Sequence, residues 1–337
     1  MPHRLQQRRL HRQRRLRGLW WLLLLLLLAG AATATLAGDY PLPWSAVVDP
    51  QSPGWQVLTS LRWPRLLGAL VVGGALALSG ALLQVLLRNP VADAGLLGIT
   101  PAAAFAAVLW LSLVGSLTIG PILLPLMAGL GAVAMTLTLM AAALRGGVGN
   151  GERLVLIGVA AGALFSGLTA FMLYRLDDLT LRQVQFWLLG SVAQISLPQA
   201  LLAALPLLLL GLWLWRRAAA IDALLLGVVE ARLAGVPVVR LQRQLLLAAA
   251  LLAAIAVVLA GGIAFVGLLV PHLLRRLGCE RHRQLLPLTL VGGGVLLLWA
   301  DQGVRLLAGS PLPLGVVTMI LGAPALLLLL WRRGPLQ

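Results

Sequence analysis

The sequence contains no lysine, since all 26 basic residues of the 337-residue chain are Arg. This absence excludes the phosphate-binding loop that ends in Gly-Lys-Ser/Thr, a Schiff-base lysine and every other lysine-dependent mechanism. Acidic residues are also scarce: the chain has 10 Asp and Glu and 4 His, and only Asp177 and Asp178 are adjacent. We therefore expect no catalytic residue, no metal site and no cofactor in this chain. The single cysteine, Cys279, excludes an internal disulfide.

Charged residues make up 11% of the chain, against about 25% in a soluble domain, and the mean hydropathy is +0.97. So few charges cannot cover a water-facing surface, so we predict an all-α polytopic membrane protein. About ten transmembrane helices are expected, at 19–37, 64–87, 96–114, 121–144, 154–174, 196–215, 244–261, 263–275, 285–300 and 313–331. The segment 263–275 is too short for a straight crossing and suits a half-helix or a helix buried inside the bundle.

The arginines give the orientation of these helices. Residues 1–18 form a basic tail, and with this tail in the cytoplasm 21 Arg lie inside and five lie outside, namely Arg62, Arg65, Arg175, Arg182 and Arg305. This bias is the positive-inside rule, so the net charge of +16 reflects topology with membrane lipid as the partner, and nucleic acid is excluded. The tail also resembles the start of a signal peptide, but the many later spans favour a first transmembrane helix.

Four segments carry a more specific pattern. They are Leu61-Arg-Trp-Pro-Arg65 continued by 73–99; 182–191; 223–236; and 261–275 with the later pieces 285–287, 298–301, 313–318 and 322–324. In this order, over about residues 55–331, they closely resemble the FecCD-type permeases of binding-protein-dependent ABC importers. Members of that family take up iron–siderophores, haem and vitamin B12.

The resemblance implies a multi-pass permease domain at 19–333 in the cell inner membrane, without enzymatic activity of its own. It implies a dimer with a second copy or a paralogue, two cytoplasmic ABC ATPases that bind ATP and Mg, and a periplasmic substrate-binding protein. The substrate would be a metal chelate. Iron–siderophores come first because most members carry them, and vitamin B12 (cobalamin) or haem is the alternative.

The third segment lies in a cytoplasmic loop at about 216–243 and reads as a helix pair broken at Gly227. Leu224, Leu225, Leu226, Val228 and Leu233 would form its apolar surface. The resemblance implies that this pair couples the permease to the ATPase through Leu226, Gly227, Glu230, Arg232 and Gly235. The alternative is an amphipathic helix that lies in the membrane interface.

The resemblance also implies roles for three outer arginines and for four residues at the inner ends of spans. Arg62, Arg65 and Arg305 would receive acidic residues of the binding protein, for which the planar guanidinium is suited; the alternative is that they reach to lipid headgroups. Asn89, Val91, Gly151 and Glu152 would lie near a cytoplasmic gate. The family has small hydroxyl residues at the last two positions, so a plain loop is equally possible there.

Two other classes of membrane protein are the alternatives to an importer permease. An ion- or proton-coupled secondary transporter needs ionisable groups near the bilayer midplane, and no acid falls inside an expected span. A membrane-anchored enzyme needs a catalytic cluster, and the sequence has none. His272 ends a short span, where helix packing is favoured over a ligand role.

Overall fold

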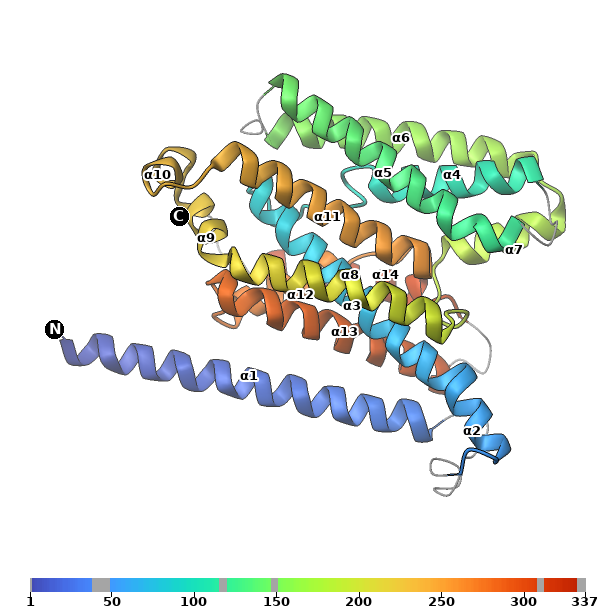
Figure 1. Cartoon of the computed structure of the whole chain (residues 1–337), viewed down its shortest axis with the longest axis horizontal. Coiled ribbons are helices and arrows are strands. Elements are labelled where there is room, and N and C mark those ends of the chain that lie inside the picture. The colour runs from blue at the N-terminus through green and yellow to red at the C-terminus, as the bar shows by residue number, and fades with distance from the viewer. Residues whose placement is uncertain (1, 38–48, 115–119, 147–150, 308–311, 332–337) are drawn as a thin grey trace.

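The computed structural model describes residues 2–37, 49–114, 120–146, 151–307 and 312–331, and these ranges contain helices and no strand (Figure 1). The helices are α1 (Pro2–Leu36), α2 (Pro53–Val57), a π-helical turn (Leu58–Arg62), α3 (Trp63–Leu86), α4 (Ile99–Val114), α5 (Gly120–Gly146), α6 (Gly151–Tyr174), α7 (Asp178–Leu188), α8 (Leu197–Arg216), α9 (Ala218–Leu226), α10 (Val228–Leu233), α11 (Val238–Ala260), α12 (Val266–Arg276), α13 (His282–Leu307) and α14 (Leu314–Trp331). The all-α fold predicted from the composition is confirmed.

Seven stretches of the described chain are long and apolar enough to cross a membrane: Arg14–Leu36, Pro53–Leu86, Leu123–Ala142, Glu152–Tyr174, Leu197–Arg216, Val238–Ala260 and His282–Leu306. The apolar helices Ile99–Val114 and Leu314–Leu328 are shorter. The molecule is thus polytopic, as expected, while the number of ten crossings stays a prediction. Helix α12 has only 11 residues and most of them, including Pro271 and His272, are buried, in keeping with a helix enclosed by the bundle.

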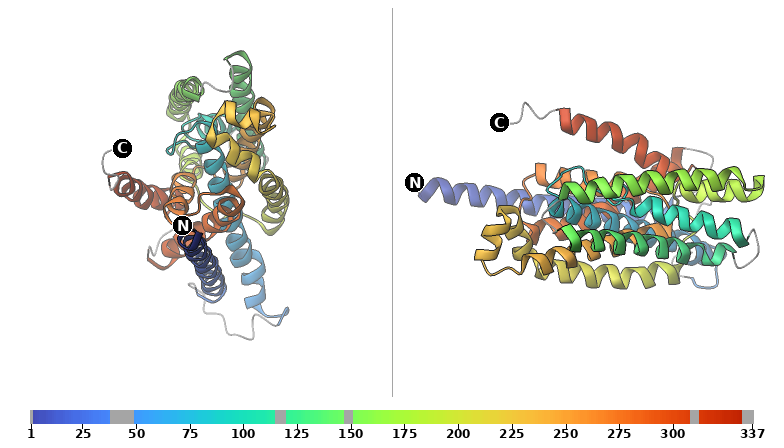
Figure 2. Two further views of the ribbon diagram at one scale, coloured as in Figure 1. Left: turned by 90° about the vertical axis from the view of Figure 1, so that its left-hand side faces the viewer. Right: turned by 90° about the horizontal axis from the view of Figure 1, so that it is seen from above.

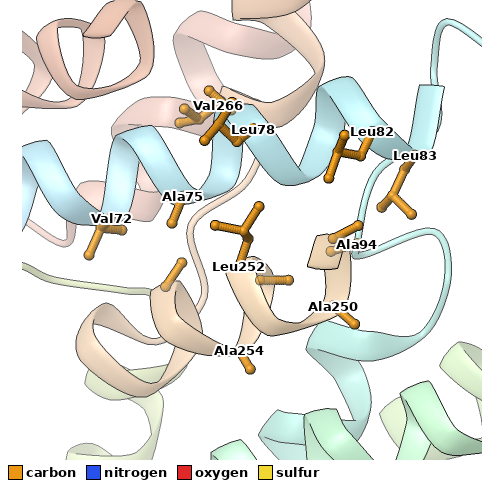
Figure 3. Close-up of a cluster of buried hydrophobic side chains, with 14 of the residues drawn as sticks. Val72, Ala75, Leu78, Leu82, Leu83, Ala94, Ala250, Leu252, Ala254 and Val266 are labelled. Carbon is orange, nitrogen blue, oxygen red and sulfur yellow. The ribbon is translucent and has the colours of Figure 1, made fainter. Parts of the chain in front are cut away.

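Helix α3 is the centre of the bundle and packs against α8, α11, α12 and α13. Figure 3 shows Leu78 of α3 next to Leu252 of α11, and both side chains are fully buried. Small residues let the backbones of transmembrane helices approach closely.

Two glycine pairs bring α3 into backbone contact with its neighbours. A Cβ atom on Gly73 would lie 2.2 Å from the carbonyl oxygen of Gly293 in α13. A Cβ on Gly80 would lie 2.0 Å from the carbonyl oxygen of Gly267 in α12. Any side chain at these crossings would push the helices apart, so the glycines fix the spacing of the core.

The helices run so that the loops divide between two ends of the molecule. The start of α1 lies at the same end as α9 and α10, and α2 and α7 lie at the opposite end (Figure 1 and Figure 2). The Arg-rich segments therefore gather at the end of α9 and α10, which the charge bias assigns to the cytoplasm.

One expectation about charge is wrong. The predicted span 285–300 left Asp301 outside the membrane helices, but α13 continues to Leu307 and encloses it. Asp301 is buried there. The structure explains how the helix carries an acid at this position: Asp301 forms an ion pair with Arg65 of α3. The pair satisfies the charge and removes the need for a break in the helix.

Candidate functional site

The helix pair α9–α10 projects from one end of the bundle, with one glycine between the two helices and a second glycine after them (Figure 1). Gly227, between the helices, has φ 141°, a conformation that L side chains rarely adopt. A Cβ there would also lie 1.8 Å from a carboxylate oxygen of Glu230. Gly235, after α10, has φ 78°. The break that the sequence predicted is present, and both turns require glycine for their backbone geometry.

The surface of the pair is apolar and accessible. Leu226 is 76% exposed and Leu233 is 85% exposed, and Leu225 and Val229 are exposed beside them. The predicted surface is wrong in two members: Leu224 is buried, and Val228 is half-buried and packs against the core, so that Val229 is exposed in its place. Four exposed apolar side chains on two short helices outside the candidate spans form what we call the coupling surface, Leu225, Leu226, Val229 and Leu233. Such a patch marks an interaction site.

The base of the pair is fixed to the bundle by polar contacts that the sequence did not reveal. Oδ1 of Asp222 in α9 accepts a hydrogen bond from the backbone N–H of His282 at 3.0 Å, and it lies 2.6 Å from Nδ1 of that residue. Nη2 of Arg88 donates to the carbonyl of Leu224 at 3.4 Å. These contacts tie α9 to the start of α13 and to the end of α3. A movement of the pair would therefore reach the core helices directly.

The pKa of the Asp222 carboxyl reflects this attachment. Partial burial raises the pKa, but the hydrogen bonds from the His282 side chain and backbone, with the positive charge of Arg281, outweigh burial and hold it below its usual range. The carboxylate is thus charged at neutral pH and stabilises the docked position of α9.

Glu230 and Arg232, the charged residues predicted for coupling, are both exposed on α10. Glu230 lies in the first turn of α10 and Arg232 in the last. An acid near a helix N-terminus and a cation near its C-terminus complement the helix dipole. Their position on the same short helix as Val229 and Leu233 leaves them available to a partner.

The three outer arginines lie at the opposite end, and each contacts the chain itself. Nε and Nη2 of Arg65 donate to the two carboxylate oxygens of Asp301 at 2.7 and 2.8 Å. Arg62 is only 5% exposed, and its Nη1 donates to the Thr35 carbonyl of α1 at 2.7 Å. Nη2 of the half-buried Arg305 donates to the Ala37 carbonyl at 3.1 Å. The arginines thus join the end of α1 to α3 and α13.

The residues predicted near a gate come from two elements that meet. Asn89 and Val91 lie in the turn after α3, where Oδ1 of Asn89 accepts from the N–H of Val91 at 3.0 Å. Helix α6 begins at Gly151, and Glu152 in its first turn is exposed. Leu154 of α6 packs against Leu87 at the end of α3. The two segments therefore share one end of the bundle.

The second and fourth sequence segments meet at the outer end, a juxtaposition that spacing alone could not show. The N–H of Ser191 donates to the Ala260 carbonyl at 2.9 Å, and the N–H of Leu314 donates to the Gly190 carbonyl at 2.9 Å. A Cβ on Gly190, which has φ 75°, would lie 2.4 Å from the Gly262 carbonyl oxygen. Glycine thus lets the end of α7, the α11–α12 turn and the start of α14 touch.

A cavity of about 650 Å³ lies beside this junction. Its lining includes the apolar Leu124 and Trp187 and the polar Arg182, Gln194 and Gln199. The second segment, 182–191, therefore forms one wall of an outer cavity. In the described part of the chain no group of three or more His, Cys, Asp or Glu side chains could hold a metal ion.

Comparison with known proteins identifies the class of protein that has this arrangement. The model of the FecCD transport family matches residues 22–332. A solved structure described as an inward-facing conformation of a putative metal-chelate type ABC transporter matches 94% of this chain and 99% of its own, with a TM-score of 0.84 and 31% identity. The chain belongs to the FecCD transport family, and it is a permease subunit of that class.

Two relatives are more similar in sequence. The vitamin B12 import system permease protein BtuC of Vibrio cholerae is 43% identical over 281 residues, which cover 82% of this chain and 83% of the relative. The hemin transport system permease protein HmuU of Yersinia pestis is 40% identical over 293 residues, which cover 83% of this chain and 84% of the relative. With these relatives and its apolar helices, the chain is a multi-pass protein of the cell inner membrane.

Proposed function

We propose that the chain is the permease of an importer for a metal chelate built on a corrin or porphyrin ring, with vitamin B12 first and haem second. The observation that carries this proposal is the 43% identity to the vitamin B12 permease of Vibrio cholerae over 82% of this chain. The haemin permease is nearly as similar. The sequence alone put iron–siderophores first, but these relatives favour the alternative, because both carry ring chelates by name.

The energy for import would come from two separate ATPase subunits. The chain has no lysine and so cannot form the usual phosphate-binding loop, and ATP and Mg would bind to the partner. The coupling surface is the proposed contact, because it is apolar, exposed and joined through Asp222 to α13. Leu226, Gly227, Glu230, Arg232 and Gly235 would transmit the ATPase movement, and the alternative, an interfacial helix, would need the surface to face lipid.

The remaining assembly is proposed from the family. A second permease, either a copy of this chain or a paralogue, would complete the pathway, and a periplasmic binding protein would deliver the substrate. Arg62, Arg65 and Arg305 stay the proposed docking residues, and Arg305 is the one to test first, because it is half-buried whereas Arg62 is buried and Arg65 binds a carboxylate with both arms of its guanidinium. Asn89, Val91, Gly151 and Glu152 stay the proposed region of the cytoplasmic gate.

The substrate can be tested in proteoliposomes that hold the permease, its ATPase and its binding protein. Cyanocobalamin, haemin and a ferric hydroxamate siderophore are offered in parallel at equal concentrations. We expect ATP-dependent accumulation of a ring chelate, with cobalamin preferred. Accumulation of the siderophore alone would contradict the proposal. Omitting the binding protein is the control for leakage.

A further inference from the structure

A shallow hollow of about 510 Å³ lies where the helix pair α9–α10, which we call the coupling pair, joins the bundle. Its lining includes three arginines, three valines and an amide, namely Arg232, Arg240, Arg243, Val236, Val238, Val239 and Gln244. No acidic residue lines it in the described part of the chain. We refer to it as the arginine hollow.

The arginines of the hollow are not engaged elsewhere in the described chain. Arg232 and Arg240 are exposed, and their guanidinium groups make no hydrogen bond or ion pair with the described residues. The Nε of Arg243 is buried and has no hydrogen-bond partner there. The amide of Gln244 accepts from Arg217 at 3.2 Å, so it is already used. A buried guanidinium N–H without a partner costs free energy unless a ligand accepts from it.

The position of the hollow relative to the membrane identifies the ligand. The stretch of α11 that is long and apolar enough to cross a membrane starts at Val238, and Arg240 and Arg243 lie in its first two turns. At the end of such a span the two arginines would lie at the level of the lipid headgroups, where the apolar side chains of Val236 and Val239 would contact acyl chains. The charge bias of the chain places this end in the cytoplasm, and basic pockets on the cytoplasmic side of membrane helices bind anionic headgroups.

We propose that the arginine hollow binds the headgroup of an anionic phospholipid of the cytoplasmic leaflet. The phosphate would accept hydrogen bonds from Arg240 and from the buried Nε of Arg243, with Arg232 contributing charge from α10. Because Arg232 belongs to the coupling pair and Arg240 to a membrane helix, the lipid would bridge the two elements. This inference concerns binding only and does not depend on which substrate is carried.

The test is native mass spectrometry of the purified permease without its ATPase, titrated with phosphatidylglycerol, cardiolipin or phosphatidylcholine. The variant is Arg240→Gln/Arg243→Gln. Its matched control is Arg153→Gln/Arg216→Gln, which removes the same charge from exposed arginines outside the hollow. We expect wild type and control to retain an anionic lipid and the variant to bind it about 25-fold more weakly, or about fivefold for each arginine.

Several results would overturn the proposal. Equal retention in the variant and the wild type would show that the arginines do not form the site. Equal retention of phosphatidylcholine would show that the negative charge is not recognised, and full competition by glycerol phosphate would indicate a site for a soluble anion. If the variant keeps the lipid and, in a separate titration, binds the ATPase more weakly than the control variant does, the arginines form a protein contact instead. If the double variant melts early, Arg240→Gln alone gives the same comparison, with about fivefold expected.

Discussion

The short distance between α3 and α13 depends on glycine, which has only a hydrogen atom where other residues have a side chain. Gly293 lies against Gly73 so closely that its Cβ would be 2.2 Å from the Gly73 carbonyl oxygen and 2.5 Å from Cβ of Ala77. Backbone atoms cannot move aside as a flexible side chain can. The close approach of α3 and α13 therefore depends on glycine at both positions.

Gly293→Ala should destabilise the permease by about 1–3 kcal/mol, because overpacking forces the two helices apart. Gly303→Ala in the same helix is the matched control, since a Cβ at Gly303 would meet no other atom within 4 Å. Thermal unfolding in detergent, followed by tryptophan fluorescence, measures both. Equal midpoints for the two variants would contradict the packing account.

The ion pair between Arg65 and Asp301 is buried at Asp301, whose side chain is 4% exposed, and half-buried at Arg65, whose side chain is 24% exposed. Arg65→Gln leaves the buried carboxylate unsatisfied and should cost about 3–5 kcal/mol, whereas Asp301→Asn leaves a guanidinium that water reaches and should cost less. The double variant should cost less than the sum of the two. Unfolding of all four proteins gives the coupling energy. If the double variant loses as much free energy of unfolding as the two single variants together, the two side chains do not interact in the folded protein.

Reversing the charge of Arg305 tests whether this side chain docks the binding protein or only holds the helices together. Arg305→Glu should slow association of the binding protein with nanodisc-held permease several-fold, because a rim charge acts mainly on the association rate. Arg175→Glu, an exposed outer arginine far from the cluster in sequence, is the control. Higher salt should reduce the association rate of the wild-type permease and so narrow the difference in rate between wild type and Arg305→Glu. An unchanged rate in a folded Arg305→Glu protein would remove the docking role.

At the scale of the elements, the coupling pair is the part most open to a partner. Leu226→Ser/Leu233→Ser should weaken ATPase binding by about tenfold or more, because both side chains are largely exposed and would be buried in the contact. Stability should change little for the same reason. Leu277→Ser is the control, since Leu277 is exposed at the end of α12, outside the pair. ATPase titration onto the immobilised permease measures the affinity.

Two outcomes would contradict the coupling role of the pair. Unchanged ATPase affinity in the double variant would assign the surface to lipid, as expected for an interfacial amphipathic helix. Equal weakening by Leu277→Ser would show that the whole end of the bundle, and not the pair, forms the contact.

The helices could be predicted from the sequence where they cross the membrane, because the thickness of the bilayer sets the length of the apolar run. The long apolar runs located most helices to within a few residues, and the positive φ of Gly227 matches the break predicted there. The exposed face of the pair was less accessible to prediction, because Leu224 and Leu225 are adjacent leucines and only tertiary packing decides that Leu224 is buried. The end of α13 was missed because hydropathy counts Asp301 as a cost and cannot see its partner, 236 residues away.

For the whole molecule, the sequence predicted topology better than chemistry. Arginine bias orders the two ends, and the structure brings α9, α10 and the start of α1 together as that order requires. Contacts between distant segments, such as those of Asp222 with His282 and of Gly190 with Leu314, come from folding in three dimensions and have no local signal. The proposed substrate followed from similarity to named relatives and not from any residue of the pathway.

The central claim is that this permease imports its chelate with energy from a separate ATPase. The direct measurement is cobalamin uptake into proteoliposomes that contain the permease and binding protein, with and without the ATPase, under either ATP or an imposed proton gradient. The account predicts uptake only with the ATPase and ATP together. Uptake driven by the proton gradient without the ATPase would contradict it.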